Sequence, residues 1–121
     1  LDNRSAIAEF VKIISNSINI KAIVIMTESG NTAITISQYR PDKNIYAFTP
    51  NVHVCNMLSL VWGVNPILTP EYKTTDSMFI EVEKILLESK LLKKKDKFIL
   101  TSGTPVGITG KTNMLRIHQI L

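Results

Sequence analysis

Cysteine is almost absent from this chain, because Cys55 is the single one among 121 residues. One cysteine excludes an internal disulfide bond and fits a reducing compartment, so we expect a cytoplasmic protein. Metal ligands are equally scarce, since the two histidines, His53 and His118, show no zinc-binding spacing with Cys55. We therefore expect no metal site in this chain.

Long apolar segments are also missing. No apolar run approaches ~20 residues, the length that spans a membrane, and the start of the chain lacks the pattern of a secretion signal. We expect no membrane partner. Apolar residues still make up 45% of the chain, which suits one core in a single domain over residues 1–121. Because the chain opens at Leu1 directly into a helical pattern, we expect a fragment of a longer protein.

Positive charge predominates, with a formal net charge of +4, and much of it lies in Lys90, Lys93–Lys95 and Lys97. Such a cluster can indicate nucleic-acid binding. Here it closes a predicted helix, where cations favour the negative end of the helix dipole. Aromatic side chains that stack on bases are missing from it, apart from Phe98 in the next apolar run. We expect no nucleic-acid partner.

Patterns of catalytic residues are weak. His53 and His118 are the side chains suited to act as a general base near neutral pH. Neither has an evident Ser or Cys nucleophile beside it with a carboxylate partner. We predict no catalytic residue in this chain.

Helical and strand patterns alternate along the sequence. Apolar residues at helical spacing predict an amphipathic helix over 4–18, and unbroken or alternating apolar runs predict strands between the helices. The expected order is helix 4–18, strand 22–27, helix 32–39, strand 44–49, helix from the Thr49-Pro50 cap to Gly63, strand 65–69, helix capped by Thr75, Asp76 or Ser77, strand 97–101 and strand 114–120. The alternation predicts an α/β fold, with a parallel sheet between helices on both faces and segment 114–120 at an edge. Within the third helix we expect Val54, Leu58, Val61 and Trp62 to face the core.

The apolar run Ala22–Thr27 continues directly into Glu28–Ala33, which combines a Ser-Gly turn with a helix start. Unpaired N–H groups at a helix N-terminus, together with nearby hydroxyls, form a site that suits an anion. We predict that the hydroxyls of Thr27, Ser29 and Thr32 converge on a phosphate. The alternative is that Ser29 and Thr32 only cap the helix while Gly30 makes the turn.

A second polar connection follows the fourth strand, between Ser102 and Thr112. Ligands of such sheets bind beyond the carboxyl ends of the strands, so this connection and the Ser-Gly turn are expected to meet over one ligand. The alternative is that residues 102–112 only form a long connection to the edge strand. The residues of this loop predicted to contact the ligand are Gly103, Gly107, Thr109, Gly110, Lys111 and Thr112.

Four segments together resemble the C-terminal domain of pyruvate kinase: Asn19–Ala33, Ser37–Pro41, Ile45–Thr49 and, in the bacterial version of the last loop, Leu100–Asn113. The resemblance covers nearly the whole chain. It implies a three-layer fold with a five-stranded, mostly parallel sheet whose last strand is antiparallel. It also implies a homotetramer in which this domain forms one of the two interfaces. Because an exposed edge strand invites pairing, we expect self-association through the C-terminal edge strand.

The resemblance further implies an enzyme of glycolysis that transfers a phosphoryl group from phosphoenolpyruvate to ADP with magnesium and potassium. The catalytic residues of that family lie in domains outside this sequence, so the fragment is expected to be inactive and to need no cofactor of its own. Its role in the family is allosteric, through a phosphorylated sugar effector. By position, the phosphate-holding residues are Thr27, Ser29, Gly30, Asn31 and Thr32, together with the loop from Gly103 to Asn113.

This chain departs from the family pattern at two pairs of positions. Members that bind fructose 1,6-bisphosphate often carry Lys at position 28 and Arg at 31, whereas this chain has Glu28 and Asn31, which favours a monophosphate effector or none. The family usually has Gly at the positions of Lys90 and Lys95, so these lysines must be left-handed or the turns differ. Two alternatives remain, a purely structural assembly module and a stand-alone small-molecule enzyme, and the lack of a clustered acid, base or nucleophile argues against the second.

Overall fold

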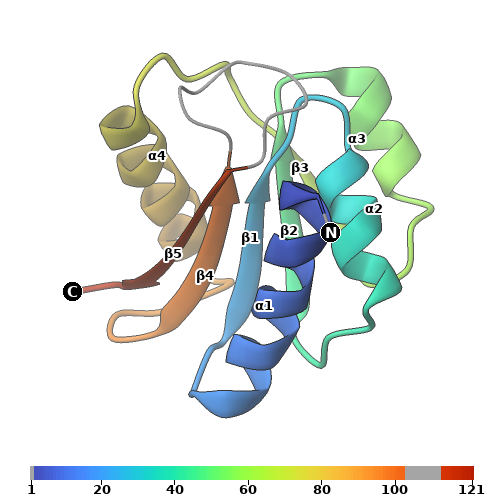
Figure 1. Cartoon of the computed structure of the whole chain (residues 1–121). Coiled ribbons are helices and arrows are strands. Elements are labelled where there is room, and N and C mark those ends of the chain that lie inside the picture. Colours follow the sequence, from blue (N-terminus) through green and yellow to red (C-terminus); the bar gives the residue numbers. More distant parts are fainter. Residues whose placement is uncertain (1, 103–112) are drawn as a thin grey trace.

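The chain folds around one five-stranded sheet with the strand order β3-β2-β1-β4-β5, shown in the computed structural model of Figure 1. The structure describes residues 2–102 and 113–121. Strands β1 to β4 run parallel, and β5 pairs antiparallel with β4. This confirms the predicted α/β fold with an antiparallel last strand. The elements are α1 (Asn3–Ser17), β1 (Ala22–Met26), α2 (Asn31–Gln38), β2 (Asn44–Thr49), α3 (Val52–Leu58), β3 (Val64–Leu68), α4 (Thr75–Glu88), β4 (Lys97–Ser102) and β5 (Met114–Gln119).

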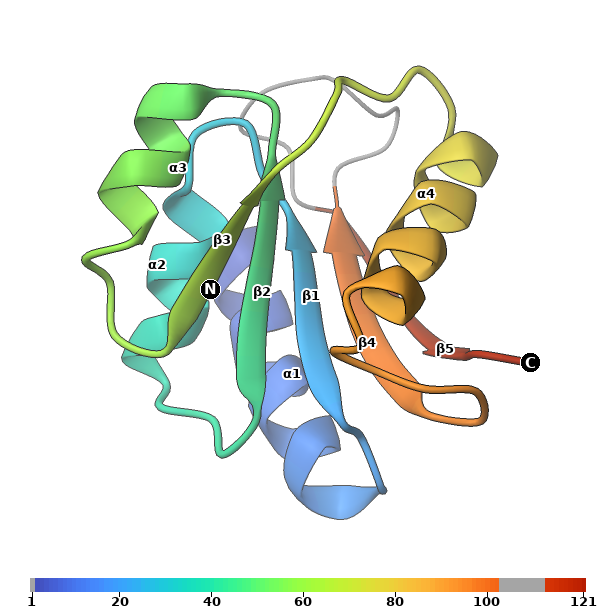
Figure 2. The same ribbon diagram turned by 180° about the vertical axis from the view of Figure 1, so that it is seen from behind.

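Helices cover both faces of the sheet, as the alternation predicted. Helices α1, α2 and α3 lie on one face, whereas α4 lies alone on the other (Figure 2). The residues of β1 alternate between the two cores: Ile23 and Ile25 pack with α1 and α2, and Ala22 and Val24 pack with α4. Because both faces of β1 are buried, the strand reads as an unbroken apolar run in the sequence.

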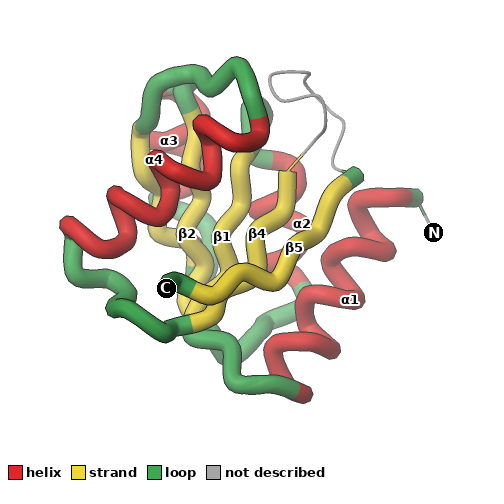
Figure 3. Tube along the Cα trace, turned by 90° about the vertical axis from the view of Figure 1, so that its left-hand side faces the viewer, coloured by secondary structure: helices red, strands yellow, loops and turns green. Residues whose placement is uncertain are grey.

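The lone helix α4 is held against the edge strand by a polar and aromatic cluster. His118 Nε2 lies 2.9 Å from Glu83 Oε2, and the imidazole stacks on Phe79 with ring centroids 5.5 Å apart. The guanidinium carbon of Arg116 lies 4.3 Å from the centroid of the same Phe79 ring. Figure 3 shows β5 at the near edge of the sheet, with α4 on one side and α1 on the other. The cluster therefore gives His118 a structural partner on α4.

Two helix starts differ from the prediction. Helix α3 is capped by Asn51, whose side-chain oxygen accepts N–H groups from His53 at 2.8 Å and Val54 at 3.2 Å, rather than by Thr49. Helix α4 is capped by Thr74, whose hydroxyl accepts the Ser77 N–H at 3.1 Å. Both segments offer more than one residue able to cap the helix, and the path of the backbone determines which one does so.

The end of α3 also differs, and with it the position of Trp62. The helix ends at Leu58, and residues 59–62 continue in tighter turns in which Val61 N–H donates to the Leu58 carbonyl. Val61 packs on the core as predicted, but Trp62 is 50% exposed, so its predicted core position was wrong. Its ring stacks instead with the Arg40 guanidinium, whose carbon lies 4.3 Å from the ring centroid.

Helix α4 ends in a Schellman motif with a lysine at the left-handed position. Lys90 has φ +59°, its N–H donates to the Leu87 carbonyl at 3.1 Å, and the Leu91 N–H donates to the Leu86 carbonyl at 3.1 Å. Lys95 is also left-handed, with φ +77°, in a turn closed by a hydrogen bond from the Asp96 N–H to the Lys93 carbonyl. Both lysines therefore adopt the conformation that glycine would adopt there without steric cost.

Replacing Lys90 by glycine is expected to raise the free energy of unfolding by about 0.5–1 kcal/mol. The left-handed conformation costs a non-glycine residue about 1–2 kcal/mol, which glycine avoids. The larger conformational entropy of glycine in the unfolded chain offsets part of this stabilisation. Urea denaturation measures the change. The matched control is Lys94→Gly, since Lys94 is exposed in the next turn of the chain and has no positive φ; the stability of this variant should fall slightly. A lower stability for Lys90→Gly than for Lys94→Gly would contradict this account.

Candidate functional site

The Ser-Gly turn lies at the carboxyl end of β1, directly before α2. Gly30 precedes the helix with φ +87°, and a Cβ atom there would lie 2.9 Å from Met57 Cε and 3.2 Å from Val54 Cγ1. The turn therefore requires glycine for two reasons, its left-handed backbone and its close approach to α3. This packing positions residues 27–32 above the end of the sheet.

The structure brings together the five predicted phosphate-binding residues of the turn. Thr27 Oγ1 accepts the Gly30 N–H at 2.8 Å, and Ser29 Oγ accepts the Asn31 N–H at 3.3 Å. These hydrogen bonds use two of the N–H groups that the sequence assigned to an anion. A hydroxyl that accepts a hydrogen bond still carries a proton to donate, so both side chains retain donor capacity toward a ligand. Thr32 is buried at the first turn of α2.

The second predicted loop leaves the sheet beside this turn. Ile25 of β1 pairs with Thr101 of β4, and the Asn113 N–H donates to the Ser102 carbonyl at 3.2 Å, so both ends of the connection lie at the carboxyl end of β4. The six loop residues predicted to contact the ligand, Gly103, Gly107, Thr109, Gly110, Lys111 and Thr112, lie outside the residues that the structure describes. The Ser-Gly turn and the described ends of the second loop therefore lie at the carboxyl ends of two neighbouring strands.

A negative charge lies within the turn itself. Burial raises the pKa of the Glu28 carboxyl, and repulsion by Glu71 raises it further. Glu71 belongs to the segment that leaves β3 and crosses the same end of the sheet toward α4 (Figure 2). Two carboxylates therefore lie at this end of the sheet, and both would repel a bound phosphate.

The crossing segment between β3 and α4 also contributes a residue that the sequence did not single out. Tyr72 is buried, and this burial raises the pKa of its phenol; the carboxylate of Glu81 adds to the rise. The sequence does offer an indication that Tyr72 is buried, namely an aromatic residue among polar loop residues, because an aromatic ring can bury a large apolar area. Tyr72 joins the core beneath α4 and so anchors the segment that carries Glu71.

Across residues 2–102 and 113–121, no three His, Cys, Asp or Glu side chains are grouped closely enough to hold a metal ion. Within the same part of the chain, no helix has both the length and the apolar character needed to cross a membrane.

Comparisons with known proteins identify the family. The family described as "Pyruvate kinase, alpha/beta domain" matches residues 5–118. The pyruvate kinase of Staphylococcus haemolyticus is 42% identical over 104 residues, which cover 86% of this chain and 18% of that protein. The pyruvate kinase of Staphylococcus saprophyticus is 41% identical over the same length.

A solved pyruvate kinase from Cryptosporidium parvum superimposes with a TM-score of 0.88 at 26% identity, covering all of this chain and 23% of that one. The structure of the Cryptosporidium enzyme in complex with ADP matches equally well and is covered to 24%. This chain thus spans about a fifth of the length of these relatives. By the family match over nearly its whole length, the chain belongs to the pyruvate kinase family and corresponds to the alpha/beta domain of that enzyme.

Proposed function

We propose that this chain is the regulatory and oligomerisation domain of a cytoplasmic pyruvate kinase, an enzyme of glycolysis that transfers a phosphoryl group from phosphoenolpyruvate to ADP. The observation that supports the regulatory role is the turn at residues 27–32, which gathers hydroxyls and a glycine before a helix at the carboxyl end of β1. Magnesium and potassium would act in the catalytic domains, and the chain alone would show no phosphoryl transfer in a phosphoenolpyruvate-dependent assay.

The effector that suits this site is a sugar monophosphate. The turn supplies hydroxyls and the positive end of α2, but Glu28 and Asn31 stand where bisphosphate-binding members often carry cations. Glu71 adds a second carboxylate, whose charge repels that of Glu28. A ligand with fewer negative charges is repelled less by this pair, so a monophosphate is favoured over a bisphosphate.

Replacing Glu28 by glutamine is expected to strengthen binding of a hexose monophosphate about fivefold. Two like charges ~4 Å apart in water repel by about 1 kcal/mol, and the substitution removes that repulsion. Isothermal titration gives the affinity, and amide chemical shifts of residues 29–32 locate the site. Glu88→Gln is the matched control, since Glu88 is exposed at the far end of α4. No shift at residues 29–32 in the parent chain would remove the effector site.

The pH dependence provides a second test of the same repulsion. Because the pKa of Glu28 is raised, its carboxyl takes up a proton at a higher pH than an ordinary glutamate. Anion binding is therefore expected to strengthen as the pH falls from neutral into the mildly acidic range, and this gain should be absent in Glu28→Gln. Sulfate is the appropriate probe, because a phosphate monoester titrates near pH 6 itself.

The purely structural alternative has its own supporting observation at the edge of the sheet. Strand β5 pairs with β4, and its other edge has no partner strand within the described part of the chain. Ile117 on this strand is 44% exposed. An exposed edge strand is suited to pair with its own copy across a two-fold axis.

Ile117→Lys is expected to abolish self-association through β5, because a charge would enter an apolar contact between the two copies. Light scattering after size-exclusion chromatography, over a range of concentrations, gives the mass of the particle. Leu60→Lys is the matched control, since Leu60 is 89% exposed and lies after α3, away from β5. A parent chain that stays monomeric at the highest concentration, or equal loss in both variants, would contradict the assembly role.

A further inference from the structure

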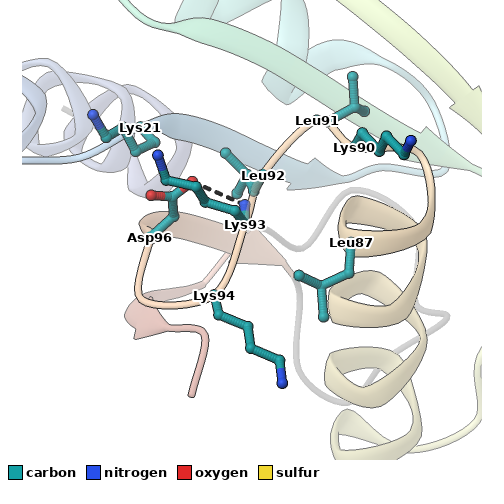
Figure 4. Close-up of a pocket in the computed structure, with 8 residues that line it drawn as sticks. All are labelled: Lys21, Leu87, Lys90, Leu91, Leu92, Lys93, Lys94 and Asp96. Atoms are coloured by element: carbon teal, nitrogen blue, oxygen red, sulfur yellow. Dashed lines mark hydrogen bonds between the residues drawn. The ribbon is translucent and has the colours of Figure 1, made fainter.

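A basic pocket lies at the end of the sheet opposite the Ser-Gly turn. It has a volume of about 500 Å³ and is formed where α4 returns to β4, beside the start of β1 (Figure 4). Four lysines line it, namely Lys21, Lys90, Lys93 and Lys94, and we call it the lysine pocket. Neither the family resemblance nor the effector proposal gives it a role.

The charge of the lysine pocket is strongly unbalanced. Among its lining residues Asp96 is the one carboxylate, and its Oδ2 atom already accepts the Lys93 backbone N–H at 2.9 Å. Four ammonium groups against one carboxylate leave a formal charge of +3 around the pocket. The pocket therefore favours an anionic ligand.

The backbone of this turn is unsuited to a compact phosphate group. The N–H groups of Leu91 and Leu92 both donate to the Leu86 carbonyl, and those of Lys95 and Asp96 donate to the carbonyls of Ile120 and Lys93. These N–H groups are therefore already hydrogen-bonded within the protein. In Figure 4 the Lys94 side chain extends away from those of Lys21 and Lys93, so the ammonium groups do not converge on one point. Spread charges of this kind suit an extended ligand.

The lysine pocket also has an apolar component. Leu87, Leu91 and Leu92 line it together with the lysines, and Leu91 is 38% exposed. No aromatic side chain is among its described lining residues, so it lacks a surface on which nucleotide bases would stack. A ligand that matches it therefore combines separated negative charges with apolar side chains.

From these features we propose that the lysine pocket is a docking site for an acidic peptide segment of a partner protein, with glutamate or aspartate interspersed with leucine-like residues. The carboxylates pair with the four lysines, and an apolar side chain packs against Leu87 and Leu91. Because the lysine charges are exposed, binding depends strongly on ionic strength and is lost in high salt. Lys90 supplies one of these charges from a left-handed position, where glycine would be less strained.

The test uses a short fluorescein-labelled peptide in which one leucine follows every two glutamates, and fluorescence anisotropy reports its binding. Lys93→Gln/Lys94→Gln is expected to weaken binding about tenfold, since each exposed ion pair contributes modestly. Lys73→Gln/Lys84→Gln removes the same charge from exposed residues outside the pocket and should leave binding unchanged. All four lysines are exposed, so these substitutions are not expected to disturb the fold.

Two further comparisons separate a peptide site from general anion attraction. Replacing the leucines of the peptide by serine should weaken binding severalfold, and Leu91→Ser should do the same. A labelled single-stranded RNA should bind more weakly than the peptide at the same ionic strength. The proposal is overturned if the parent chain does not bind the peptide at low salt, if both double variants lose it equally, or if RNA binds more tightly.

Discussion

Gly30→Ala is expected to lower the free energy of unfolding by about 2–3 kcal/mol. The substitution places an alanine at φ +87°, where the left-handed conformation costs about 1–2 kcal/mol, and its Cβ enters a contact of 2.9 Å with Met57 and 3.2 Å with Val54. The Met57 methyl group can move, but Val54 is a stiff side chain on α3 and yields less. Urea denaturation with an unchanged m-value gives the difference.

Gly63→Ala separates the two causes of this loss. Gly63 has φ +71°, but a Cβ there would have no atom within 4 Å, so only the backbone cost of about 1 kcal/mol applies. The difference between the two variants measures the packing of the Ser-Gly turn against α3. Equal losses would show that this turn is not tightly packed against Met57 and Val54 of α3.

Phe98→Ala is expected to cost about 3–5 kcal/mol, the largest loss among the substitutions considered. Phe98 is fully buried on β4, and its ring centroid lies 5.2 Å from that of His118 on β5. Removing the ring leaves a cavity beneath α4 and also removes one of the two aromatic contacts that hold His118. We therefore expect the amides of β5 to exchange with solvent faster than those of β1 in this variant.

The control for this prediction is Phe10→Ala. Phe10 lies on α1 and is 57% exposed, so its truncation should cost less than about 1 kcal/mol. Denaturation curves give both stabilities, and hydrogen exchange followed by NMR gives the order in which strands open. A uniform increase of exchange over all five strands in Phe98→Ala would show that β5 is not preferentially held by this ring.

The order of helices and strands could be predicted because it follows from the spacing of apolar residues along the sequence. The run from Ala22 to Met26 is apolar on both faces, and α4 repeats apolar residues at helical spacing. Such periodicities depend only on which side of a helix or strand is buried, so they can be recognised without knowing which elements it packs against. The family resemblance, rather than periodicity, supplied the antiparallel direction of β5.

Local choices among similar residues were less predictable. Thr74 caps α4, although three further candidates follow it, and Asn51 caps α3 two residues after the expected Thr49. Trp62 was assigned to the core, yet it lies beyond the end of α3 with its ring against Arg40. These outcomes depend on where the chain must turn to meet its neighbours, and propensity alone does not contain that information.

Some features of the candidate site could likewise be predicted from the sequence, and others could not. The sequence by itself determined the residue types at the end of β1, the need for glycine at position 30, and a carboxylate at position 28, because these follow from the order of residues along one strand and one turn. Only the tertiary structure decided that Glu71 approaches Glu28, that Met57 and Val54 close over Gly30, and that Lys21 joins the lysines of the turn before β4. These contacts join segments far apart in the chain, and their distances are set by how the strands are ordered and how the helices pack on them.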